Sequence, residues 1–198
     1  NEDYIRVEIR QHIHTLLQQF VQESLPSMLR KAYKAKKMES VELMLQLRRI
    51  VCDWNGNNGE EPDNLYELKK ILPGLEVVGI DISNYAIKNS PKSLRKNLIN
   101  KKIESNFIKN LKYKKFDLTI SMGCLHNLKI YNLRKAIKNI NSISKNSYIL
   151  VESFQNQKEL FNLQCWALTC EAFFSKREWI YLFDLFGYKG DYEFIYFK

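Results

Sequence analysis

Two apolar segments that each end in an aspartate constrain the fold of this chain most. Residues 49–59 begin with an apolar run, reach Asp53 and continue into a stretch rich in Asn and Gly. Residues 75–83 repeat the pattern with Asp81, and residues 64–74 between them have a helical pattern closed by a Pro-Gly stop signal. This order predicts a strand, a loop, a helix and a second, parallel strand. The two aspartates should therefore lie at neighbouring strand ends, where such sheets bind nucleotides.

Strands and helices continue to alternate along the rest of the chain. The sequence predicts a helix at 83–91, a third strand between 98 and 107, a fourth at 116–121 and a fifth at 147–153. A helix over 133–143 connects the last two strands. The alternation indicates an α/β domain built on a mostly parallel sheet. The apolar face of the connecting helix comprises Leu133, Ala136, Ile137, Ile140 and Ile143.

The first 48 residues are predicted to form a helical leader. Apolar residues recur at steps of three and four over residues 4–24, which places them on one face of a helix. Such a leader could cover the mouth of the site as a lid, pair with a second subunit in a homo-oligomer, or simply pack on the sheet. We therefore divide the chain into a leader at 1–48 and a main domain at 49–198.

Length and composition narrow the class of protein. The 198 residues suffice for one domain with one sizeable core. No apolar run approaches the roughly 20 residues that a membrane-spanning helix needs, and no secretory signal is visible at the N-terminus. The four cysteines, Cys52, Cys124, Cys165 and Cys170, show no CxxC spacing. These features favour a soluble protein in the reducing cytoplasm.

The formal charge of +9 raises the question of an anionic partner. Most basic residues are lysines scattered among Asn and Ile, without the interleaved aromatic residues that single-strand binding requires. We take the excess as compositional bias and expect no nucleic-acid partner. His12 and His14 would lie about 200° apart on a helix. Cys165 and Cys170 have no second pair of ligands, so no metal site is predicted.

The chain resembles the class I S-adenosylmethionine-dependent methyltransferases over about residues 49–198. Residues 51–59 take the place of the glycine-rich motif, residues 77–83 resemble the acidic ribose-binding motif, and residues 116–121 resemble the fourth-strand motif. A capping box opens a last helix at 175, which is followed by a glycine and a closing aromatic stretch. The resemblance implies a Rossmann-like methyltransferase fold, with a mostly parallel seven-stranded sheet, a C-terminal antiparallel strand and flanking helices.

The same resemblance implies S-adenosyl-L-methionine as the cofactor and assigns residues to it. Asp53 would hold the amino group of the cofactor through the loop. Asp81 would accept hydrogen bonds from both ribose hydroxyls, which a carboxylate does with full charge assistance. Ile82 would pack against the adenine, and Ser121 would contribute from the end of the fourth-strand motif.

The loop after the first strand departs from the family pattern. The family has an acid followed by three alternating glycines, whereas Asn55 and Asn57 occupy the first two of these positions and Gly59 the third. Gly56 is out of phase. Glycine allows positive φ and a close approach to the ligand, and Asn is its best substitute for positive φ. We expect these four residues to contact the cofactor in a rebuilt loop with Gly56 in a shifted role; otherwise the affinity for the cofactor is reduced or lost.

The remaining site residues follow from chemistry and from position. Glu104 is the nearest candidate for an acid that contacts adenine, with Asn106 as a rival. Methyl transfer to a hydroxyl requires alignment and removal of a proton. His126 is the best general-base candidate because imidazole titrates near neutrality, although a structural role is equally compatible with its position. Glu171 and Glu152 are further candidates.

The acceptor is expected to be a small molecule that offers a hydroxyl or an amine. Residues 155–174 lie where this family places acceptor-binding residues, and their aromatic side chains would suit a sugar or would pack in the core. The stretch 162–174 resembles methyltransferases of bacterial surface-polysaccharide biosynthesis. Two other functions stay open: a catalytically inactive methyltransferase-like binding subunit, and an NAD(P)-dependent oxidoreductase, which would require a G-x-G-x-x-G loop.

Overall fold

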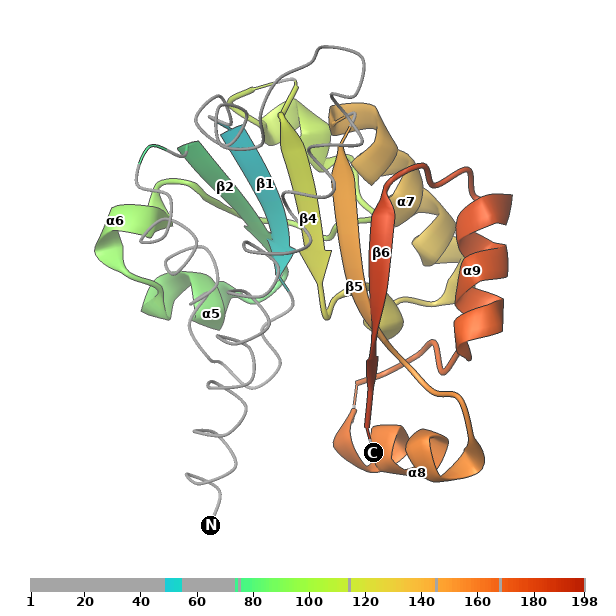
Figure 1. The fold of residues 1–198 in the computed structure, drawn as a ribbon. Helices are drawn as coiled ribbons and strands as arrows, with labels where there is room; N and C mark the ends of the chain where they lie inside the picture. The colour runs from blue at the N-terminus through green and yellow to red at the C-terminus, as the bar shows by residue number, and fades with distance from the viewer. Residues whose placement is uncertain are drawn as a thin grey trace.

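A computed structural model of the chain describes the backbone of residues 49–54 and residues 74, 76–113, 115–144, 146–167 and 169–197. The described part is an α/β domain with one parallel sheet (Figure 1). The strands lie in the order β3-β2-β1-β4-β5-β6, and every neighbouring pair is parallel. The strands are β1 (Arg49–Trp54), β2 (Glu76–Asp81), β3 (Leu98–Asn100), β4 (Leu118–Met122), β5 (Ser147–Ser153) and β6 (Asp191–Tyr196).

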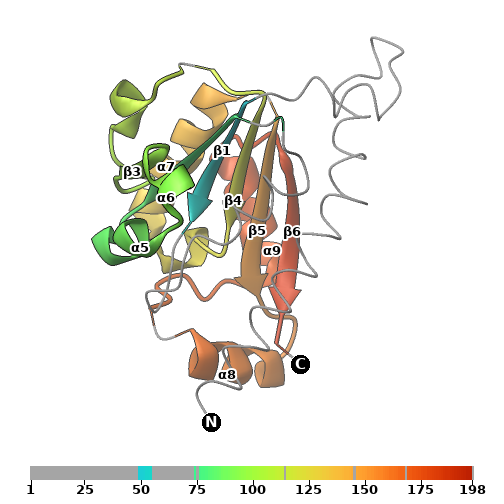
Figure 2. The same cartoon turned by 90° about the vertical axis from the view of Figure 1, so that its left-hand side faces the viewer.

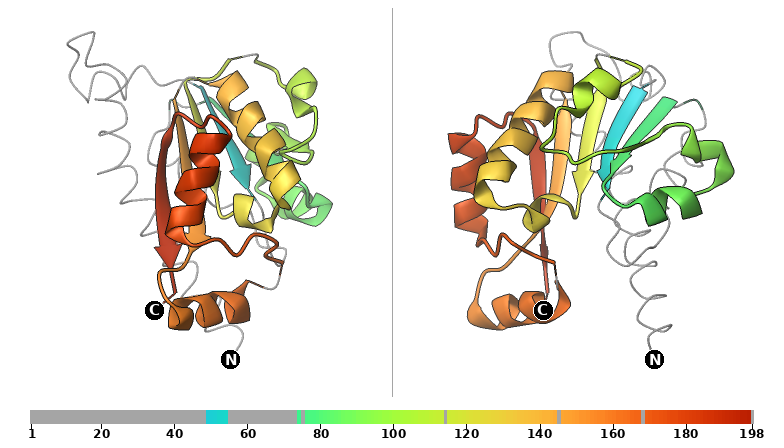
Figure 3. Two further views of the ribbon diagram at one scale, coloured as in Figure 1. Left: turned by 90° about the vertical axis from the view of Figure 1, so that its right-hand side faces the viewer. Right: turned by 180° about the vertical axis from the view of Figure 1, so that it is seen from behind.

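Helices connect the strands and cover the sheet. The helices α7 and α9 lie side by side on one face, α5 and α6 lie beside β2 and β3, and α8 lies beyond the carboxyl end of β5 (Figures 1 and 3). The described helices are α5 (Asn84–Asn89), α6 (Lys92–Arg95), η2 (Phe107–Asn110), η3 (Leu125–Asn127), α7 (Ile130–Ile143), α8 (Gln157–Trp166) and α9 (Lys176–Leu185), where η marks a 3-10 helix.

Local capping signals place two helix starts as predicted. The hydroxyl of Ser83 accepts a hydrogen bond from the Ala86 N–H, 3.1 Å away, and begins α5. At α9 the Ser175 hydroxyl accepts from the Glu178 N–H, while the Glu178 carboxylate accepts from the Ser175 N–H at 2.7 Å. This reciprocal capping box satisfies backbone donors that a helix start otherwise leaves without partners.

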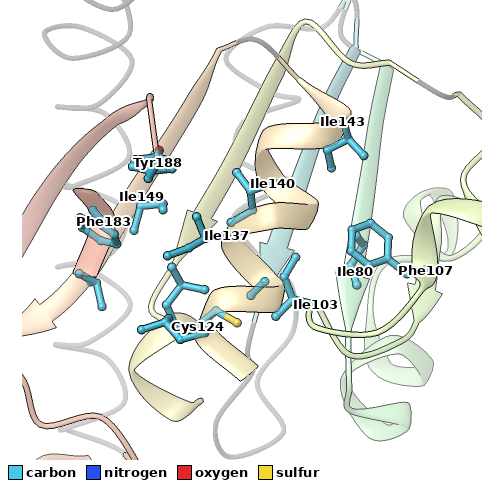
Figure 4. Close-up of a cluster of buried hydrophobic side chains, with 14 of the residues drawn as sticks. Ile80, Ile103, Phe107, Cys124, Ile137, Ile140, Ile143, Ile149, Phe183 and Tyr188 are labelled. Carbon is cyan, nitrogen blue, oxygen red and sulfur yellow. The ribbon is translucent and has the colours of Figure 1, made fainter. Parts of the chain in front are cut away.

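The core lies between the sheet and α7. All five residues predicted for the apolar face of this helix are fully buried. They pack against Ile80 and Ile149 of the sheet and against Ile103 and Phe107 of the chain after β3 (Figure 4). Burying an aliphatic side chain of this size stabilises the fold by about 1.5–3 kcal/mol. The α7 face is therefore a main source of the domain's stability.

The prediction that the C-terminal strand is antiparallel is wrong. Residues 191–196 form a single strand that pairs in parallel with β5, in register from Tyr148 with Asp191 to Ser153 with Tyr196. The sheet of the described residues therefore has six strands, one fewer than the seven predicted. The helix α9 carries the chain back across the sheet, which is the connection that parallel strands need. Alternating aromatic residues indicate a strand but not its direction.

Several predicted segments lie outside the described residues. These are the leader at 1–48, the helix at 64–72 and the loop residues Asn55, Gly56, Asn57 and Gly59. The third strand, expected between 98 and 107, is the short strand β3.

Candidate active site

The carboxyl ends of β1, β2 and β4 meet at one edge of the sheet. Asp53 of β1 is in register with Ile80 of β2 on one side and with Ser121 of β4 on the other. Asp81 follows Ile80 directly. The predicted proximity of the two aspartates along neighbouring strand ends is therefore present in the backbone, although the Asp53 side chain lies outside what the structure describes.

Asp81 is held firmly at the end of β2. Its side chain is 4% exposed, and Oδ1 accepts a hydrogen bond from the Ser83 N–H at 2.6 Å. The Asn100 amide on the neighbouring strand donates to the carbonyls of Asp81 and Ile82, at 3.1 and 2.8 Å. Ile82 itself is 53% exposed. A fixed carboxylate directly beside an exposed apolar side chain suits a ribose and its attached base.

A buried carboxylate–imidazole pair lies past the ends of β4 and β5. Nδ1 of His126, in η3, contacts Oε2 of Glu152, near the end of β5. The two side chains are 1% and 3% exposed. Gly123 has a φ of +61°, and a Cβ at this position would lie 3.3 Å from Oε1 of Glu152. The backbone between β4 and η3 therefore turns tightly against the carboxylate, as glycine permits.

The chain between α8 and α9 docks onto this pair. The carbonyl of His126 accepts hydrogen bonds from the N–H groups of Glu171 and Ala172, at 3.0 and 2.9 Å, and from the Cys170 thiol at 3.4 Å. The indole N–H of Trp179 donates to the carbonyl of Glu152 at 3.1 Å. Burial raises the pKa of Cys170 to about 11, with the charges of Glu152 and Glu171 adding to the effect. This thiol therefore stays protonated and is a poor nucleophile near neutral pH.

The other predicted site residues have different surroundings. The backbone N–H of Glu171 donates to the carbonyl of His126, while the side chain of Glu171 is exposed. Ser121 is fully buried in the row of the sheet that includes Ile80 and Ile149, so it faces the α7 layer. Glu104 is half-buried in the chain after β3.

Two residues of this edge were not predicted. Asn100 and Gly123 each stand at or just after a strand end, and this position was the available signal. Among the described residues, no three His, Cys, Asp or Glu side chains gather closely enough to hold a metal ion. No helix in this part of the chain is long and apolar enough to span a bilayer.

Comparisons with known proteins decide the family. The pattern of a methyltransferase domain family matches residues 50–187. The chain belongs to this methyltransferase family. The oxidoreductase hypothesis is thereby set aside, and the methyltransferase uses S-adenosyl-L-methionine as its cofactor. The described residues fit this cofactor, because Asp81 and Ile82 place a fixed carboxylate and an exposed apolar side chain at the end of β2.

Solved structures support the same fold at low sequence identity. A SAM-dependent methyltransferase from Archaeoglobus fulgidus aligns with a TM-score of 0.54 and 18% identity, over 88% of this chain and 74% of that one. The mitomycin 7-O-methyltransferase MmcR aligns with a TM-score of 0.53 and 14% identity, over 86% of this chain and 54% of MmcR. The present chain therefore spans about half of the length of MmcR. A chain of the complex between the Haloferax volcanii Trm112 methyltransferase activator and a methyltransferase gives 0.51 and 13%, over 86% and 75%.

A second family pattern covers the beginning of the chain. The cytoplasmic Fragile-X interacting family matches residues 1–72, which overlap the methyltransferase match from residue 50 onward. In the overlap, β1 is a central strand of the described sheet, between β2 and β4. No curated protein sequence matches the chain.

Proposed function

We propose that this methyltransferase acts on a hydroxyl or amine of a small molecule, such as a sugar, and that His126 is its general base. The observation that carries the proposal is the buried pair of His126 and Glu152 at the carboxyl edge of the sheet, the edge that also holds Asp81. S-adenosyl-L-methionine supplies a methyl group activated by a sulfonium. Such a reaction needs the protein to align the acceptor and, for a hydroxyl, to take its proton.

Glu152 gives the imidazole its orientation. A carboxylate at Nδ1 stabilises the imidazolium that forms when the other nitrogen, Nε2, accepts a proton. Because the pair is almost fully buried, an acceptor can reach Nε2 only by entering the interior of the strand-end edge. Glu152 is thus a positioning residue, and His126 is the group that touches the acceptor.

The test uses methyl transfer from S-adenosyl-L-methionine with a radioactive methyl group to a panel of sugars, phenols and amines. With the best acceptor, His126→Gln is expected to lower kcat by about 10²–10⁴-fold, the usual contribution of a general base. Glu152→Gln should shift the pH dependence of kcat, while Asp184→Asn, at an exposed carboxylate of α9, should leave it unchanged. Wild-type pH dependence in both His126 and Glu152 variants would contradict the assignment.

The proposed role of Glu171 is weaker and separable. Its exposed carboxylate lies one residue from Cys170, whose thiol docks on the His126 carbonyl, so it borders the proposed acceptor site. Glu171→Gln should raise KM for an amine acceptor with little change in kcat, because an exposed carboxylate would attract the acceptor and not react with it. An unchanged KM would remove Glu171 from the site.

We further propose a cytoplasmic location. The support is the match of residues 1–72 to a family described as cytoplasmic. Fractionation of cells expressing the tagged full chain tests this, and recovery with the membrane pellet would contradict it.

A further inference from the structure

The positive charge of the chain is concentrated in one continuous segment. Residues 82–146 contain fifteen of the 31 Lys and Arg residues and only two of the 22 Asp and Glu residues. This segment alone therefore carries more positive charge than the +9 of the whole chain, and the remainder is net negative. A uniform compositional bias would not deplete acids from one third of the sequence.

The fold joins two parts of this segment, α7 and the chain after β3. In Figure 2, α5, α6, β3 and α7 fall on the same side of the view, but Figure 1 shows α7 beside α9 and apart from α5 and α6. The Asn139 amide of α7 donates to the carbonyls of Ile103 and Ser105 at 2.7 and 2.9 Å, which joins the helix to the chain after β3. Ile103 and Phe107 anchor the same stretch in the core (Figure 4). The charged side chains of α7 and of the chain after β3 therefore project from segments whose backbone is held in place by packing and hydrogen bonds.

Six exposed cations on these two elements form what we call the basic face. On α7 they lie on the solvent side, opposite the buried stripe, and positions 134 and 138 are about 6 Å apart along the helix axis. The other three belong to the chain between β3 and the end of η2. The basic face comprises Lys101, Lys102, Lys109, Arg134, Lys135 and Lys138.

We propose that the basic face binds the phosphate backbone of a duplex nucleic acid. Clustered, exposed Lys and Arg side chains are the electrostatic footprint of phosphate binding. Of the large exposed hydrophobic side chains of the described residues, Ile130 and Tyr131 lie at the start of α7 beside these cations. One aromatic ring is less than the series of stacking side chains on which single-stranded nucleic acids bind. The partner is therefore a duplex read through its backbone, independently of its sequence.

An anionic membrane is the competing partner for a basic surface. A helix that lies in a membrane interface inserts an apolar face between the lipids. The apolar stripe of α7 is fully buried against the sheet and is not available for insertion. Of the described residues there, only Ile130 and Tyr131 at the start of α7 expose large apolar side chains, far less than the apolar face of an interfacial helix, and this favours a nucleic acid.

The experiment measures binding of the full chain to a fluorescent duplex RNA of 20 base pairs, by anisotropy over a series of salt concentrations. The variant R134Q/K135Q/K138Q should bind at least 10-fold more weakly at about 0.1 M salt. Its slope of log K against log salt should be smaller in magnitude by about 2–3, since each phosphate contact contributes about 0.9. The matched control is K176Q/R177Q/K189Q, which removes the same charge from exposed positions on and after α9.

Each outcome decides the proposal, and it can fail without affecting the proposed methyl transfer. Loss of binding in the α7 variant alone, with both variants folded by circular dichroism, supports the basic face. Equal loss in both variants would mean that binding follows net charge, and this overturns the proposal. Absence of duplex binding at 50 mM salt, or binding only to vesicles of phosphatidylserine and phosphatidylcholine, also overturns it.

Discussion

Glu152→Ala removes one partner of the buried pair formed with His126. The two side chains are 3% and 1% exposed, so water cannot replace the lost carboxylate. Removing one member of such a pair typically costs about 3–5 kcal/mol, because the other polar group stays buried without its partner. For a chain of this size, 3 kcal/mol corresponds to a fall in the melting temperature of about 6–12 °C.

A double-mutant cycle separates this pair from the general cost of changing buried residues. We expect Glu152→Leu and His126→Leu each to lower the free energy of unfolding. The double variant should lose less free energy of unfolding than the sum of the two single losses, by about 2 kcal/mol or more. Urea unfolding followed by circular dichroism gives all four free energies. The exposed pair of Lys112 and Glu76, with Nζ and Oε2 at 3.9 Å, is the control, and Lys112→Ala should leave the urea midpoint unchanged.

Additivity would refute the reasoning. If the two single effects sum to the double effect within about 0.5 kcal/mol, then His126 and Glu152 do not interact energetically in the folded protein. The assignment of Glu152 as the positioning residue would fall with that result.

Three further predictions concern the fold, the thiols and the loop. Gly190→Ala should prevent the close approach of β6 to β5, because a Cβ there would overlap the carbonyl of Ser147 and the hydroxyl of Tyr188. Thermal melting should show a large loss of stability, and a wild-type melting temperature would contradict this prediction. Iodoacetamide at pH 8 should modify the exposed Cys165 well before Cys170. The raised pKa of Cys170, about 11, leaves roughly 0.1% of this thiol as thiolate at pH 8, so its reaction should become fast only as the pH rises toward 11. Peptide mass spectrometry measures the modification of both cysteines, and equal rates at pH 8 would contradict the burial of Cys170. Asn55→Gly combined with Asn57→Gly should leave the fold intact and tighten binding of S-adenosylhomocysteine in calorimetry, and unchanged affinity would show that this is not a shifted glycine loop.

Features set by neighbouring residues were predictable from the sequence. The buried face of α7 follows from apolar residues at steps of three and four, and the starts of α5 and α9 follow from Ser83 and from the pair Ser175 and Glu178. Each signal lies within a turn or two of the structure that it predicts. The order of strands and helices then limits the sheet to a parallel α/β arrangement.

Features set by distant contacts were not predictable in the same way. The direction of β6 depends on how α9 crosses the sheet, and the aromatic pattern of 191–197 fits either direction. The pairing of His126 with Glu152 depends on β4 lying beside β5, which joins residues 26 positions apart. The grouping of the positive charge over residues 82–146 is already present in the sequence, but the joining of α7 to the chain after β3 depends on long-range hydrogen bonds of Asn139.

Binding of S-adenosylhomocysteine, measured by isothermal titration calorimetry, tests the central claim most directly. The account predicts micromolar binding by the wild-type chain. Asp81→Asn keeps an oxygen for the Ser83 N–H but loses the charge, and it should weaken binding roughly 10- to 100-fold. The control Asp184→Asn should bind like the wild type. No binding by the wild-type chain, or equal binding by all three proteins, would contradict a cofactor site at the end of β2.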